Sequence, residues 1–156
     1  MTTAHFSEKA VESLAAFISS GLPAKLRIVE TECGLGAQDL PDPVAVLRGQ
    51  DEAFGRSPIV EVWEETLASG EPGDETASVA CRIGLAFVGD ADAIADQLKL
   101  RRYQTAMLKL LQSDRKLGGT VAGAIEGTFQ ITSVKTAESK IYHTFTVPVG
   151  VELYEP

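Results

Sequence analysis

Two segments of the chain alternate apolar and polar side chains over a long stretch, and this pattern restricts the possible folds more than any other feature. The apolar positions of the first segment are Ala77, Val79, Cys81, Ile83, Leu85 and Phe87. Those of the second, with His143 in the same register, are Ile141, Phe145, Val147, Val149, Val151 and Leu153. Successive side chains of a strand point to opposite faces of a sheet, so both segments are predicted to be strands with one buried face.

Two further segments are predicted to extend this sheet. Residues 58–66 read as a strand, and turn residues at 70–74 indicate a hairpin into the strand at 77–87. The apolar residues that alternate before the last strand are Val121, Ile125, Phe129 and Ile131. Pro148 has no backbone N–H, so it predicts that the last strand lies at a sheet edge or carries a bulge.

A first helix is predicted from Ser7, whose hydroxyl can cap a free backbone N–H, to Gly21, with Pro23 beyond its end. Apolar residues at three- and four-residue spacing form its buried stripe: Ala10, Val11, Leu14, Phe17 and Ile18. Leu26 and Ile28 then alternate with basic residues and predict a short first strand.

A second, longer helix is predicted from Asp90, as its N-cap, to about Gln112. One apolar stripe of this helix consists of Ala93, Leu100, Tyr103, Met107, Leu110 and Leu111. Ile94, Leu98 and Leu108 lie nearly opposite that stripe. Because the sheet can cover only one side, these three residues are expected to contact the first helix or another subunit.

The connection at 33–57 is long and rich in Gly, Asp and Pro. An Asp-Pro pair within it can start a short helix over 44–48. Loops of this length usually carry a function, so we expect it to contact a partner. The candidate contact residues are Asp42, Val44 and Leu47.

In chain order the predicted elements are α-β-β-β-α-β-β, with the short helix in the loop after the first strand. Strands that come in pairs favour an antiparallel-dominated sheet, and the two main helices are expected to pack on one of its faces. The length suits one hydrophobic core. The sequence therefore predicts a single α+β domain over residues 1–156.

The charge is acidic, at −8 from 14 basic and 22 acidic residues, and residues 1–75 alone hold 5 basic and 14 acidic residues. Affinity for nucleic-acid phosphates comes mainly from Lys and Arg, so we expect no nucleic-acid binding. No apolar run approaches the roughly 18 residues of a membrane span, so no membrane contact is expected. Cys33 and Cys81 lack a CxxC pattern and are expected to be free thiols of a protein made in the cytoplasm.

Residues that commonly carry catalysis are sparse. His5 lies near the N-terminus, and His143 falls in register with core positions, so His143 is expected to be structural. The Cys and His residues lack metal-ligand spacing. Gly34 and Gly36 lack the third glycine and the strand–turn–helix setting of a dinucleotide site. We therefore expect no enzyme activity, no metal and no cofactor.

One acidic pair, Glu61 and Glu64 beside Trp63, leaves an enzymatic alternative open. Two carboxylates can perform acid–base chemistry when one has a raised pKa, so a small hydrolase-like enzyme is a second hypothesis. A small-molecule or peptide-binding module is a third. A solvated acidic edge is the simpler interpretation of the pair.

The end of the second helix carries the most specific motif of the chain. Residues 107–124 read MLKLLQSDRKLGGTVAGA, in which a charged last turn leads into Leu-Gly-Gly and then into strands. This resembles the tail-terminator and related neck or tail-completion proteins of tailed bacteriophages, where a helix, a D-x-x-L-G-G-type turn and two closing strands recur. The likeness covers element order over 6–153 and individual residues over 114–123. The residues that carry over, as a structural turn, are Leu117, Gly118 and Gly119.

The resemblance implies a structural virion protein that forms a ring homo-oligomer, commonly a hexamer, capping the tail tube and mediating head–tail joining. Its implied partners are further copies of itself, the tail tube protein and head-connector or neck proteins. A ring around a DNA conduit should keep Lys and Arg off its inner wall. The hairpin at 61–75 is the candidate wall, with Glu64, Glu65 and Glu71 as lumen-facing acids.

Overall fold

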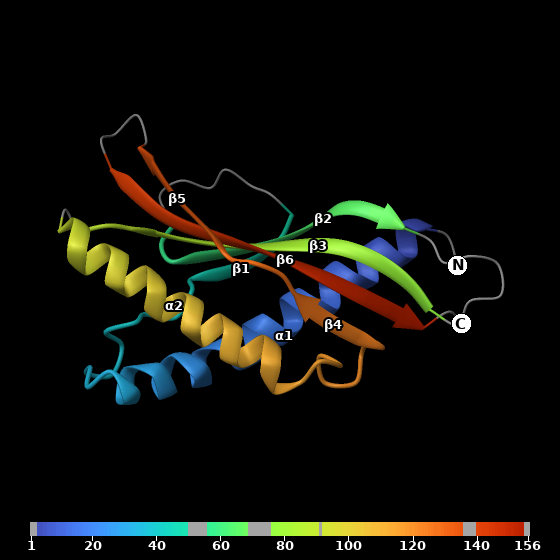
Figure 1. Ribbon diagram of the computed structural model, residues 1–156, viewed down its shortest axis with the longest axis horizontal. Helices are drawn as coiled ribbons and strands as arrows, with labels where there is room; N and C mark the ends of the chain where they lie inside the picture. Colours follow the sequence, from blue (N-terminus) through green and yellow to red (C-terminus); the bar gives the residue numbers. More distant parts are fainter. Residues whose placement is uncertain (1–2, 50–55, 69–75, 91, 136–139, 155–156) are drawn as a thin grey trace.

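The computed structural model of the chain describes residues 3–49, 56–68, 76–90, 92–135 and 140–154 (Figure 1). Within these ranges, two helices and six strands follow one another in the order α-β-β-β-α-β-β-β. The elements are α1 (Thr3–Glu32), β1 (Ala45–Arg48), β2 (Ile59–Ala68), β3 (Thr76–Val88), α2 (Ala93–Ser113), β4 (Gly123–Glu126), β5 (Gln130–Lys135) and β6 (Ile141–Tyr154). The predicted α+β class is confirmed.

The sheet is mixed but mostly antiparallel. Its order is β1-β2-β3-β6-β4, and β5 also pairs with β6. The β1–β2 pair is parallel and every other pair is antiparallel. The longest pairing joins β3 to β6, from Thr76 opposite Tyr154 to Val88 opposite Tyr142. The predicted strands at 58–66, 77–87 and 141–153 and the antiparallel pairing of the first two are confirmed, whereas the turn predicted at 70–74 lies outside the described residues.

The core lies between the helices and one face of this sheet. The alternating apolar residues of β3 and β6 are buried there, together with Leu14, Ile18 and Leu22 of α1 and Leu100 and Met107 of α2. The intervening residues on β3 and β6, such as Ser78 and Glu152, are more exposed. The two helices also contact each other where Gly21 faces Leu110.

The prediction that the first helix runs from Ser7 to Gly21 is wrong at both ends, and so is the strand predicted at Leu26 and Ile28. The helix begins at Thr3, Ser7 is buried inside it, and Pro23 is accommodated in its interior. A proline inside a helix costs about 3 kcal/mol. Burial of one large aliphatic side chain contributes roughly 1.5–3 kcal/mol, and three such residues follow Gly21 on the buried stripe, so burial outweighs the proline. They are Leu22, Leu26 and Val29.

The short helix predicted over 44–48 is also wrong, because this segment forms β1, and the described residues contain no helix there. The backbone N–H of Val44 donates to Pro58 O at 2.8 Å, and Ala45 to Arg48 pair with Ile59 to Val62. An isolated helix of one or two turns is marginal. Pairing with β2, together with the packing of Val46 against the core, therefore decides the conformation.

The segment predicted as one strand around Val121 to Ile131 is divided into β4 and β5, which lie along different parts of β6 (Figure 1). At the break, Gly127 N–H donates to Pro148 O at 2.7 Å. In an antiparallel strand the N and O of one residue point to the same side, so the missing donor of Pro148 faces this break. Pro148 therefore lies inside an interior strand, and the irregularity it predicted belongs to the neighbouring strands.

The second helix starts slightly later than predicted. Asp92, rather than Asp90, is the N-cap, and its carboxylate accepts the N–H of Ala95 at 3.1 Å. Asp90 instead donates its backbone N–H to Asp96 Oδ1 at 3.1 Å. The helix end predicted at about Gln112 is confirmed within one residue.

Candidate functional site

The Leu-Gly-Gly turn after α2 has a conformation that depends on its sequence. Leu117, Gly118 and Gly119 all have positive φ, at 50°, 77° and 89°. No heavy atom lies within 4 Å of a Cβ added to either glycine, so the left-handed backbone rather than lack of space selects glycine here. Leu117 is 3 % exposed and packs in the hydrophobic core, which anchors the turn.

Asp114 organises this turn from the end of α2. Its carboxylate accepts the backbone N–H groups of Lys116 and Gly118, both at 2.9 Å. The guanidinium of Arg115 pairs with Glu126 on β4, and this hydrogen bond is the main cause that lowers the pKa of the Glu126 carboxyl. The D-x-x-L-G-G segment thus holds the end of α2 against β4.

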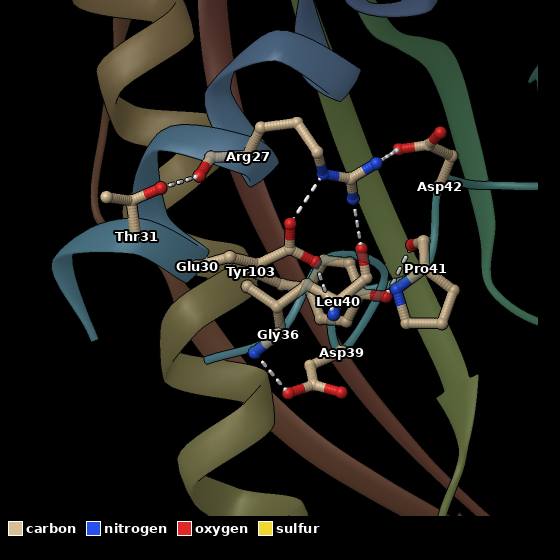
Figure 2. Close-up of polar contacts among 9 residues, drawn as sticks. All are labelled: Arg27, Glu30, Thr31, Gly36, Asp39, Leu40, Pro41, Asp42 and Tyr103. Carbon is tan, nitrogen blue, oxygen red and sulfur yellow. Dashed lines mark hydrogen bonds and ion pairs between the residues drawn. The ribbon is translucent and has the colours of Figure 1, made fainter. Parts of the chain in front are cut away.

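A polar cluster around the buried carboxylate of Glu30 fixes the segment after α1 (Figure 2). Arg27 Nε lies 2.6 Å from Glu30 Oε1, and its guanidinium also donates to Leu40 O at 2.6 Å. The other carboxylate oxygen of Glu30 accepts the N–H of Leu40 at 2.9 Å. Arg27 further pairs with Asp42 at 3.1 Å. The start of the loop is therefore attached to the helix that precedes it.

Tyr103 of α2 completes the attachment by donating its hydroxyl to Pro41 O at 2.6 Å (Figure 2). Burial, followed by the charge of Asp42, raises the pKa of Tyr103. Three residues of this loop are predicted to contact a partner. Asp42 forms an ion pair with Arg27, Leu47 is half-buried on β1, and Val44 is 57 % exposed. Their role in partner binding stays a prediction.

This cluster is not apparent from the sequence when the first helix is taken to end at Gly21. Arg27 and Glu30 stand three residues apart, the spacing that brings an ion pair together on a helix. That signal is visible only when the helix is continued past Pro23.

His143 forms a second buried polar contact. Its Nε2 lies 3.3 Å from Asp96 Oδ2, and both side chains are at most 9 % exposed. The ring packs against Phe87 with centroids 5.6 Å apart. The structure thus places His143 among core residues, and Asp96 was not expected as its partner.

The acidic residues that the structure describes on β2 do not gather on one surface. Glu64 lines a hollow beside α1 together with Glu8 and Arg48. Glu61 lines a different hollow with Trp63, so the carboxylates required by the hydrolase-like alternative do not converge.

Glu65 pairs with Arg82 at 2.6 Å. Arg82 lies among residues of the helix-free face, beside Thr146. Glu71 lies outside the described residues. The assignment of Glu64, Glu65 and Glu71 to a lumen stays a prediction.

The apolar residues predicted to face away from the core on α2 differ in exposure. Ile94 is 81 % exposed and Leu98 is 41 % exposed, whereas Leu108 is half-buried. Ile94 and Leu98 are therefore left uncovered by the described residues of the same chain.

At each lateral end of the sheet, a strand beside a helix has one edge that pairs with no other described strand. In the described part of the chain, β1 pairs only with β2, and β5 pairs only with β6. A hollow of about 180 Å³ lies between α1 and β1 and is lined by Ala16, Ser19 and Val46. Another of about 240 Å³ lies between α2 and β5 and is lined by Arg101 and Ile131.

Among the residues that the structure describes, no three His, Cys, Asp or Glu side chains are grouped to hold a metal ion. No helix in those ranges is long and apolar enough to cross a membrane. Neither a family model nor a curated protein sequence matches this chain.

Proposed function

We propose that the chain is a structural subunit of a bacteriophage tail, a tail terminator or neck protein that forms a ring at the end of the tail tube. The observation that carries the proposal is the turn at Asp114 to Gly119. Its sequence is the part that resembles those proteins, and its three positive φ angles and Asp114 cap make it a specifically built helix-to-strand junction.

The open ends of the sheet support an assembling role. Unpaired strand edges readily bind another strand, and proteins that remain monomeric usually protect them. Among the described strands, β1 is open at one lateral end of the sheet and β4 and β5 are open at the other, and β1 and β5 each lie beside a hollow next to a helix. Two different edges on one subunit suit a head-to-tail contact, which produces rings when the rotation closes.

Exposed apolar side chains on α2 supply a further surface. Ile94 and Leu98 lie on the solvent side of this helix, and Val44 is exposed just before β1. In this proposal they contact the tail tube or the head-connector proteins. The acidic character of the chain, at −8, fits a ring through which DNA passes without binding.

Electron microscopy of the purified protein tests the proposal. The protein is mixed with tubes assembled from the tail tube protein encoded in the same genome. We expect ring-shaped density at one end of each tube and none along its sides. Tubes with two bare ends at saturating protein would overturn the proposal.

A further inference from the structure

We propose that copies of this chain join head to tail, with the open edge of β1 on one copy meeting the open edge of β5 on the next. The inference rests on the proposed ring and names the two surfaces that form it. The occupant of each edge is therefore a second copy of this chain.

The topology favours this pairing over contact between two identical edges. β1 and β5 lie at opposite lateral ends of the same sheet, separated by β2, β3 and β6. If a β1 edge meets a β5 edge, each copy keeps one edge of the other kind free for the next copy. Contact between two identical edges would stop at a dimer, because it uses the same patch twice.

Apolar residues stand at both edges on the same face of the sheet. Val46 of β1 lines the hollow beside α1 and packs partly on the core. Ile131 of β5 lines the hollow beside α2 and is 56 % exposed. When the edges meet, these side chains come to the same face of a continued sheet, where each can cover the other.

The charges beside the two edges are of opposite sign. Arg101 lines the α2–β5 hollow and is exposed. The hollow at the end of β1 is lined by Glu8, Glu12, Arg48 and Glu64, and Arg48 pairs with Glu12 at 3.3 Å, so the exposed Glu8 and Glu64 give it a net negative charge. In the described part of the chain Arg101, Glu8 and Glu64 form no ion pair. In this arrangement Glu64 faces the neighbouring copy rather than the lumen.

Charge reversal at each edge, followed by mixing, tests the inference. In Arg101→Glu the altered β5 edge repels the acidic β1 edge of the next copy. In Glu8→Lys/Glu64→Lys the altered β1 edge repels Arg101. Each variant alone should show an assembly constant weakened by roughly tenfold or more, because like charges face each other at every junction.

The equimolar mixture should assemble again, since each junction then joins opposite charges. Arg102→Glu is the matched control, with the same charge change one residue further along α2 but outside the hollow, and it should assemble as the wild type does. Sedimentation at low salt, where such attraction is strongest, measures the masses. Circular dichroism checks that each variant folds.

Three results would overturn the inference. They are a wild type that stays monomeric at every concentration, an Arg101→Glu variant that assembles normally, and a mixture that does not recover. Rings on tail tubes made by Arg101→Glu would reject this interface while leaving the proposed function intact. If the protein assembles as the charges require but does not bind the ends of tail tubes, the proposed function is rejected and the interface is kept.

Discussion

The carboxylate of Glu30 accepts the backbone N–H of Leu40 at 2.9 Å, and the Glu30 side chain is only 3 % exposed. A charge so deeply buried is stable only beside an opposite charge. Arg27, at 2.6 Å from the same carboxylate, provides that charge and binds Leu40 O as well. This pair joins the last turns of α1 to the loop that leads to β1.

Arg27→Ala should therefore lower the free energy of unfolding by about 2–4 kcal/mol, because it leaves Glu30 buried without its cation. Urea denaturation measures the change. Adding Glu30→Gln should recover part of the loss, since the amide is neutral and its oxygen can still accept from Leu40. An unchanged denaturation midpoint in Arg27→Ala would show that the pair does not hold the loop.

Gly21→Ala should destabilise the contact between the helices. The added Cβ would lie 2.5 Å from Leu110 Cδ1, in a packed core. Overpacking costs about 1–3 kcal/mol, whereas alanine gains about 1 kcal/mol in helix propensity. In a Leu110→Ala background the clash is absent, so the same change should stabilise by about 1 kcal/mol. Equal effects in the two backgrounds would contradict the close approach.

Gly119→Ala should cost about 1–3 kcal/mol, because its φ of 89° is strained for any residue with a Cβ. Gly123→Ala, four residues on, is the matched control. Neither glycine has a heavy atom near an added Cβ, but only Gly119 has a positive φ. Equal thermal midpoints for the two variants would remove the argument that this turn requires glycine.

Stability should fall at alkaline pH. Burial, and then the negative charge of Glu64, raises the pKa of the Cys81 thiol from 9.0 to about 12. Above pH 9.0 the Cys81 thiol ionises in the unfolded chain but stays neutral in the folded protein. The free energy of unfolding therefore decreases as the pH rises toward about 12. The slope is about 1.4 kcal/mol per pH unit for one such group.

Tyr103, whose pKa is raised mainly by burial, acts in the same direction as Cys81. Denaturation of Cys81→Ala over the same pH range should therefore give a shallower slope than the wild type. A slope that Cys81→Ala leaves unchanged would show that this thiol does not contribute.

The two long strands were predictable because burial of one face of a strand requires an apolar residue at every second position of the sequence. The strands around Val79 and Val149 appear where the alternation places them. The turn at Gly118 and Gly119 was predictable for a similar local reason, since a glycine pair after a helix commonly takes positive φ.

The elements that were predicted wrongly depend on contacts between residues far apart in the sequence. Gly21 and Pro23 look like a helix end, but Gly21 is where Leu110 approaches from α2. Whether Val44 to Arg48 forms a helix or a strand depends on β2, which supplies its hydrogen-bond partners. The pairing of His143 with Asp96 likewise depends on how α2 crosses β6.

The length distribution of growing tail tubes tests the central claim most directly. Tube protein is allowed to polymerise with increasing, substoichiometric amounts of this chain, and the lengths are measured by electron microscopy. A subunit that caps tube ends should stop growth, giving shorter tubes with a ring at one end as its concentration increases. A length distribution that is the same with and without the chain would contradict its assignment as a tail terminator.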